Sequence, residues 1–152
     1  MHMPISDLAH LLAALSPRRH PGTWAWCSLA VEAALDADAQ PVATMREEEG
    51  LSVVIADEKA AERGWPVAFR AAWITLRVHS DLHAVGLTAA VADALATAGI
   101  ACNMIAGVNH DHLFVPVERA GDAMHVLAAL QAGGSHANSR MPASGRRPDT
   151  ED

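Results

Sequence analysis

The chain has 152 residues, of which 51% are hydrophobic and 19% are charged, and it carries a formal net charge of −7. This length forms one domain or two very small ones, and the apolar fraction is well above that of disordered chains. The acidic balance argues against nucleic acid as a partner, because binding phosphates requires a basic face. No apolar run reaches the ~18 residues that span a bilayer. Nor does the N-terminus resemble a secretory signal, so we expect a cytoplasmic protein with no membrane partner.

The N-terminal half reads as a helix, three strands and a second helix. Leu8, Leu11, Leu12 and Leu15 follow the i, i+3, i+4, i+7 spacing of one buried helix face. Ser6 is the expected N-cap and Pro17 the expected end of this helix. Strands are expected over residues 23–31, 42–45 and 51–55, and a short helix over 57–63.

The C-terminal half reads as strand, helix, strand, strand, helix. Residues 73–78 alternate in polarity, as strands do. An apolar helical stripe runs from Leu87 to Ala98, and Gly99 ends it. Strands over residues 100–108 and 113–117 form a hairpin, and a last helix runs from Ala120 to about Gln131.

The order of these elements predicts an α+β protein. We expect two ferredoxin-like units, each an antiparallel sheet with helices on one face. Their boundaries are expected at 1–68 and 69–132, and the polar segment 133–152 is expected to be disordered. Each half is one strand short of the ferredoxin-like order, so the remaining sheet edges require cover from the other half or from a second chain.

The segment from Trp73 to Leu130 resembles an ACT domain. The resemblance rests on a strand, a short loop, Gly-Leu early in a helix, and the sequence AGI leading into a strand that contains Asn103. The stretches REEEGLSVVI, VHSDLHAVGLTAAV and HDHLFVPVE are similar to the small tandem ACT proteins of bacteria, with a divergent N-terminal unit. The resemblance implies a regulatory module that binds a small molecule, usually an amino acid, between two ACT units. We also expect the protein to be a homodimer. This sequence departs from the family pattern in having no clear strand after the last helix.

A ferredoxin-like second unit would place its first strand–helix loop beside its hairpin turn. The helix expected to begin near Leu82 would offer free backbone N–H groups to a ligand carboxylate. Gly86 would allow close approach, Asn103 would bind the amino-acid head group, and Asp81 or Glu47–Glu49 would bind the ammonium group. The complete set of candidate ligand-binding residues is His79, Ser80, Asp81, Leu82, His83, Val85, Gly86, Asn103, His110, Asp111 and His112.

Two other interpretations of this cluster remain open. His79 and His83 are four residues apart, and His110 and His112 are two apart, so the histidines could bind a metal in a small metalloprotein or metalloenzyme. Alternatively, His110 and His112 could simply pair with Asp111 or with backbone carbonyls and fix the turn. We find no phosphate-binding loop, no dinucleotide fingerprint and no nucleophile elbow, and therefore expect a non-catalytic protein without a cofactor.

The two cysteines and four tryptophans are expected to be structural. Cys27 and Cys102 are too far apart in sequence for a Cys-x-x-Cys site, and two cysteines cannot form a disulfide scaffold. Both thiols are therefore expected in the core. The tryptophans Trp24, Trp26, Trp65 and Trp73 are expected as core or interface aromatics.

Overall fold

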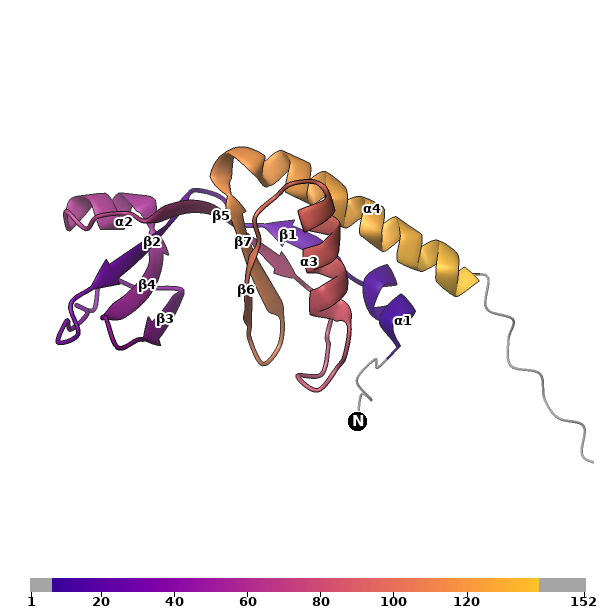
Figure 1. Cartoon of the computed structure of the whole chain (residues 1–152), viewed down its shortest axis with the longest axis horizontal. Coiled ribbons are helices and arrows are strands. Elements are labelled where there is room, and N and C mark those ends of the chain that lie inside the picture. Colours follow the sequence, from indigo (N-terminus) through magenta and orange to yellow (C-terminus); the bar gives the residue numbers. More distant parts are fainter. Residues whose placement is uncertain (1–6, 140–152) are drawn as a thin grey trace, which may run out of the picture.

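The computed structural model describes residues 7–139, with the side chains of residues 7–134 (Figure 1). Its elements are α1 (Leu8–Ala13), β1 (Pro17–Arg19), β2 (Trp24–Leu29), β3 (Ala43–Arg46), β4 (Leu51–Ala56), α2 (Asp57–Glu62), β5 (Phe69–Leu76), α3 (Leu87–Thr97), β6 (Asn103–Ala106), β7 (Asp111–Pro116), a 3₁₀ turn (Val117–Arg119) and α4 (Ala120–Ser139). Within the described residues, no helix is long and apolar enough to cross a membrane.

All seven strands join one antiparallel sheet with the order β3-β4-β2-β5-β7-β6, and β1 pairs with β5 beside β2. The sheet contains two ferredoxin-like units that share β5. In the first unit, β5 is the fourth strand, because Phe69–Ala71 pair with Trp24–Trp26. In the second unit, β5 is the first strand, because Ala71–Leu76 pair with Asp111–Pro116.

The N-terminal strand β1 supplies the strand that the sequence lacks after its last helix. Pro17–Arg19 pair antiparallel with Ile74–Leu76, and the His20 N–H donates to the Trp73 carbonyl at 2.9 Å. In a ferredoxin-like unit the fourth strand lies antiparallel to the first, and β1 occupies this position beside β5. The sequence reading missed β1 because three residues that begin with proline carry no alternating pattern.

The helices lie on one face of the sheet, as expected. In the second unit, α1, α3 and α4 bury their apolar faces against β5 and β7; Leu11, Val91, Leu127, Ile74 and Leu113 are fully buried there. In the first unit, α2 packs on β2 and β4 around Cys27 and Ile55. Residues 30–41 form no helix between β2 and β3, where a ferredoxin-like unit would have one.

The opposite face of the sheet carries most of the aromatic side chains. Trp24, Trp26, Phe69, Trp73 and Phe114 gather there around Val54 and Ala71. Trp26 meets Phe114 edge-on at 5.5 Å between ring centroids, and Trp24 meets Trp73 edge-on at 5.0 Å. Such pairs stabilise beyond the burial of their area. We call this surface the helix-free face.

The remaining core expectations are also confirmed. Trp65 packs against the first-unit core, and Cys27 is buried there. Cys102 is half-buried at the second-unit core, and both thiols are free. Burial raises the pKa of each thiol, which leaves little reactive thiolate at neutral pH.

Three helix limits differ from those expected from the sequence. The first helix is capped by Asp7, whose carboxylate accepts from the Ala9 N–H at 3.0 Å; Ser6 lies outside the described residues. The helix expected near Leu82 begins at Leu87, because a turn occupies the preceding residues. The last helix continues to Ser139 instead of ending near Gln131, so residues 133–139 of the expected disordered tail are helical, and 140–152 lie outside the described residues.

Contact with α1 explains why α4 continues through two glycines. A Cβ on Gly134 would lie 2.7 Å from both the Ala13 nitrogen and the Leu12 Cβ, so glycine alone permits this helix approach. Nothing lies within 4 Å of a Cβ built on Gly133. The packing of α1 on α4 therefore outweighs the low helix propensity of glycine, which costs about 1 kcal/mol per residue relative to alanine.

The two glycines provide a matched test of this packing. Gly134→Ala should destabilise the protein by about 1–3 kcal/mol, because the added methyl group forces α1 away from α4. Gly133→Ala should stabilise it by up to about 1 kcal/mol through helix propensity alone. Urea unfolding measures both free energies, and a similar stabilisation by both substitutions would contradict the helix contact.

Candidate functional site

The loop after β5 and the hairpin turn between β6 and β7 meet at one end of the second unit, as expected. Figure 1 shows both at the lower edge of this unit. The Ser80 hydroxyl lies 3.4 Å from a carboxylate oxygen of Asp111, and the rings of His79 and His110 are 5.0 Å apart. We call these two segments, residues 77–86 and 107–111, the rim.

Asp81 fixes the shape of the loop in the rim. Its carboxylate accepts from the His83 N–H at 2.9 Å, and its carbonyl accepts from the Ala84 N–H at 2.8 Å. Aspartate commonly stabilises turns in this way. The loop then enters α3 through Gly86, whose φ of 104° is a left-handed conformation that favours glycine. This local turn is the reason why α3 begins at Leu87.

The N-terminus of α3 is open toward the rim. Gly86 provides no capping side chain, and the first turn of α3 contains no acidic residue. Thr88 and Ala89 in this turn are exposed, and the first N–H groups of a helix have no partner within the helix. Together with the helix dipole, these donors favour an anion such as a carboxylate. The N-terminus of this helix therefore lies at Leu87, five residues later than the sequence suggested.

Apolar side chains are unusually exposed at the rim. The exposed fractions are 62% for Leu82, 84% for Val85 and 79% for Val108. The first two lie in the loop and the third lies in the hairpin turn. A surface that exposes neighbouring large apolar side chains is typical of a contact with another molecule.

Asn103 and His112, the remaining predicted residues, are not part of the rim. Asn103 lies opposite Phe114, at the end of β6 that is remote from the turn. His112 pairs with Ile105, and its side chain is on the helix-free face. Successive side chains of a strand point to opposite faces, which separates His112 from Asp111.

His112 belongs to a polar network that crosses the helix-free face. Its Nδ1 accepts from the Trp73 indole N–H at 3.1 Å and lies 2.9 Å from the Thr75 hydroxyl. The same hydroxyl lies 2.7 Å from Nε2 of His20, whose ring stacks on Trp73 with centroids 3.6 Å apart. The sequence did not predict a role for His20. The pairing of β1 with β5 places His20 in this network, and nothing in the sequence around His20 indicates that pairing.

The donors in this network assign the histidine protons. An indole N–H can only donate, so Nδ1 of His112 carries no proton and the Thr75 hydroxyl also donates to it. The Thr75 oxygen then accepts from Nε2–H of His20. Protonation of His112 at Nδ1 would break its hydrogen bond with the Trp73 indole and would force the Thr75 hydroxyl to turn from donor to acceptor. The network therefore favours a neutral His112.

The pKa values of both histidines follow from this environment. Burial lowers the pKa of His112, and His110 lowers it further, while Asp111 raises it. Burial also lowers the pKa of His20, with smaller contributions from Arg18 and His112 in the same direction. Both rings therefore favour the neutral form.

No metal centre is found in the described part of the chain. No group of three or more His, Cys, Asp or Glu side chains there is placed to hold a metal ion. Glu47, expected as a possible ammonium ligand, accepts a hydrogen bond from Ser52 at the turn between β3 and β4.

The histidine network predicts that stability falls in mild acid. A histidine whose pKa is lowered by folding binds more protons in the unfolded state, so the free energy of unfolding decreases as pH falls below about 6.5. His112→Gln should lower the free energy of unfolding by about 1–3 kcal/mol at pH 7.5. Between pH 7.5 and pH 5.5, however, the variant should lose less stability than the unsubstituted protein. Urea unfolding at both pH values tests this, and an equal acid loss in the variant would disprove the assignment to His112.

Comparison with protein-family models gives two matches, both described as ACT domain, at residues 3–72 and 69–129. The two matches overlap at the start of β5, the strand that both units share. No curated protein matches the chain.

Three solved structures are similar to this chain. A protein of unknown function from Vibrio cholerae, described as a possible transport protein, is 42% identical; the match covers 82% of this chain and 95% of that chain, with a TM-score of 0.74. A protein from Agrobacterium tumefaciens is 19% identical, with coverage of 76% and 87% and a TM-score of 0.58. A structure of aspartokinase alpha and beta subunits is 14% identical, with coverage of 75% and 95% and a TM-score of 0.55. The two more distant structures show the shared fold, and the family matches together with the 42% identical relative show that the chain belongs to the ACT-domain family.

Proposed function

We propose that this protein is a regulatory module that binds an amino acid at the rim of its second unit and catalyses no reaction. The observation that carries the proposal is the meeting of the 77–86 loop with the hairpin turn beside the open N-terminus of α3. ACT domains generally bind small ligands in regulation, which gives the role its class.

Opposite charges at the rim suit the two ends of an amino acid. The backbone N–H groups of the first turn of α3 would bind the carboxylate. Asp81 and Asp111 would bind the ammonium group, because both supply carboxylate oxygens on the facing segments. His79 and His110 would contact the side chain of the ligand. Asn103 and His112 lie outside this arrangement.

A second copy of the chain would complete the site. Leu82, Val85 and Val108 are exposed beside the proposed contacts, and a partner unit would remove them from water. We therefore propose a cytoplasmic homodimer in which the ligand lies between two units. A ligand that contacts both units favours one relative arrangement of them, which is how binding would be transmitted.

A thermal-shift screen against the twenty amino acids tests the proposal. At a hundred times its Kd, a ligand should stabilise the folded protein by about 2.7 kcal/mol and raise the Tm by several degrees. Asp81→Asn should raise the ligand concentration needed for a given Tm shift about tenfold, because it removes a charge-assisted contact with the ligand. The asparagine amide oxygen can still accept from the His83 N–H.

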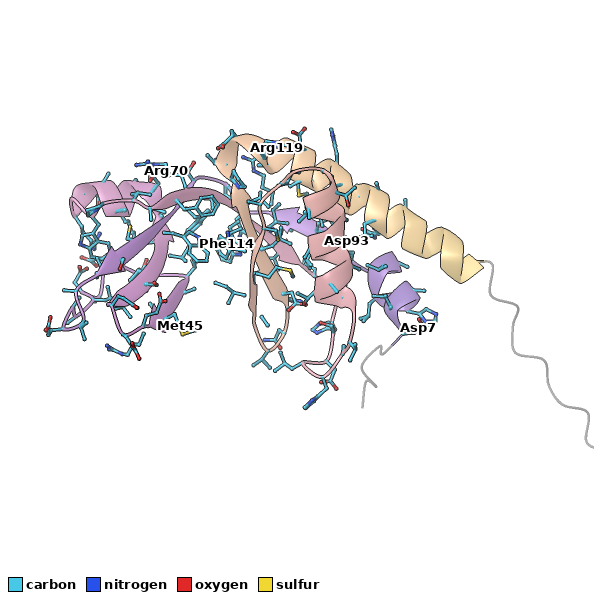
Figure 2. All side chains as sticks on the ribbon, in the orientation of Figure 1. Asp7, Met45, Arg70, Asp93, Phe114 and Arg119 are labelled. Carbon is cyan, nitrogen blue, oxygen red and sulfur yellow. The ribbon has the colours of Figure 1, made fainter. Side chains whose placement is uncertain are left out.

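Asp93→Asn is the matched control, since Asp93 is exposed on α3 away from the rim (Figure 2). It should leave the ligand-induced shift unchanged. The absence of any shift with all twenty amino acids at millimolar concentration would exclude amino acids as the ligand.

A further inference from the structure

A hollow of about 280 Å³ opens on the helix-free face, between the two edge strands of the sheet. Its walls come from both units: Ala43, Thr44 and Met45 of β3 lie on one side, and Ile105 of β6 lies on the other. These strands are at opposite ends of the strand order and are not hydrogen-bonded to each other. The curl of the sheet thus brings its two edges over a common cavity.

The lining of this hollow is mostly apolar. Trp26 and Val54 form part of it, together with Ala43, Met45 and Ile105. A second hollow of about 50 Å³ adjoins it through Ala43 and Ile105 and reaches Trp73, Phe114 and His112. Figure 2 shows Phe114 between the two halves of the sheet. The space is near the lower limit for small-molecule sites, so it suits a ligand with one ring or one branched chain.

Glu47 is the only charged side chain that lines the larger hollow. The remaining polar side chains there are Thr44 and Ser52, and the Ser52 hydroxyl donates to the Glu47 carboxylate. No lysine or arginine lines either hollow. A cation is therefore favoured in this site, whereas a carboxylate would face Glu47 without a basic partner.

Trp26 supplies a further feature that suits such a ligand. Its indole can hold an ammonium group or an apolar ring by its face. A ring bound against this indole would also change the surroundings of its buried Nε1–H group.

From these observations we propose a second ligand site on the helix-free face, formed by Trp26, Ala43, Met45, Glu47 and Ile105. It binds a small amine that has an apolar, ring-sized body and one ammonium group but no carboxylate. The body enters between β3 and β6, and the ammonium group lies at Glu47. Because the ligand contacts both edge strands, its binding favours one relative position of β3 and β6, and therefore one curvature of the sheet.

Titration of ¹⁵N-labelled protein with 2-phenylethylamine tests this site, and 3-phenylpropionate serves as the matched acid. The amine should shift the indole N–H signal of Trp26, which is assigned by its loss in Trp26→Phe. Glu47→Gln should weaken amine binding about threefold, as expected for an exposed carboxylate. The control Glu48→Gln changes a neighbouring carboxylate that does not line the hollow and should have no effect.

Two substitutions that fill the hollow from opposite edges should abolish the shift: Ile105→Trp from β6 and Ala43→Leu from β3. Their thermal melts establish that each variant is folded, and Asp81→Asn at the rim should bind the amine normally. The proposal is overturned if the amine produces no Trp26 shift or if the acid binds equally well. A shift that survives in either folded, filled variant would also overturn it. None of these outcomes bears on amino-acid binding at the rim.

Discussion

The pairing of β5 on both sides is the constraint on which this fold depends. Phe69–Ala71 complete the first unit through β2, and Ala71–Leu76 begin the second unit through β7. The N-terminal strand then crosses to pair with the second unit, and α1 packs on α4 at the far end of the chain. Contacts between residues so distant in sequence require both units to fold together, and they place the edges of the sheet relative to each other.

The same sheet separates two chemically different surfaces. At the rim, the loop and the hairpin turn combine carboxylates, two imidazoles and exposed apolar side chains beside the N-terminus of α3. On the helix-free face, aromatic side chains surround the network of His20, Thr75 and His112. The hollow lies between β3 and β6, whereas the rim is formed by the loop after β5 and the hairpin turn. Ligands at the two sites therefore need not compete for the same residues.

His112 joins the stability of the fold to the geometry of the helix-free face. Its Nδ1 accepts hydrogen bonds from Trp73 and Thr75 of β5, and its ring borders the smaller hollow. Protonation would disturb the position of Trp73, which lines that hollow too. The histidine that the sequence placed among the ligand contacts of the rim therefore contributes to the packing of the sheet instead.

Local pattern in the sequence determined the α+β class, most strands and helices, and the meeting of residues 79–86 with 110–111, since these follow from periodicity and from the direction of successive strands. Tertiary structure alone decided the sharing of β5, the place of β1, the extension of α4 through Gly134, and the face on which His112 lies. Each of these features depends on partners more than thirty residues away in the sequence. The residues of a short segment such as Pro17–Arg19 do not indicate which strand the segment pairs with.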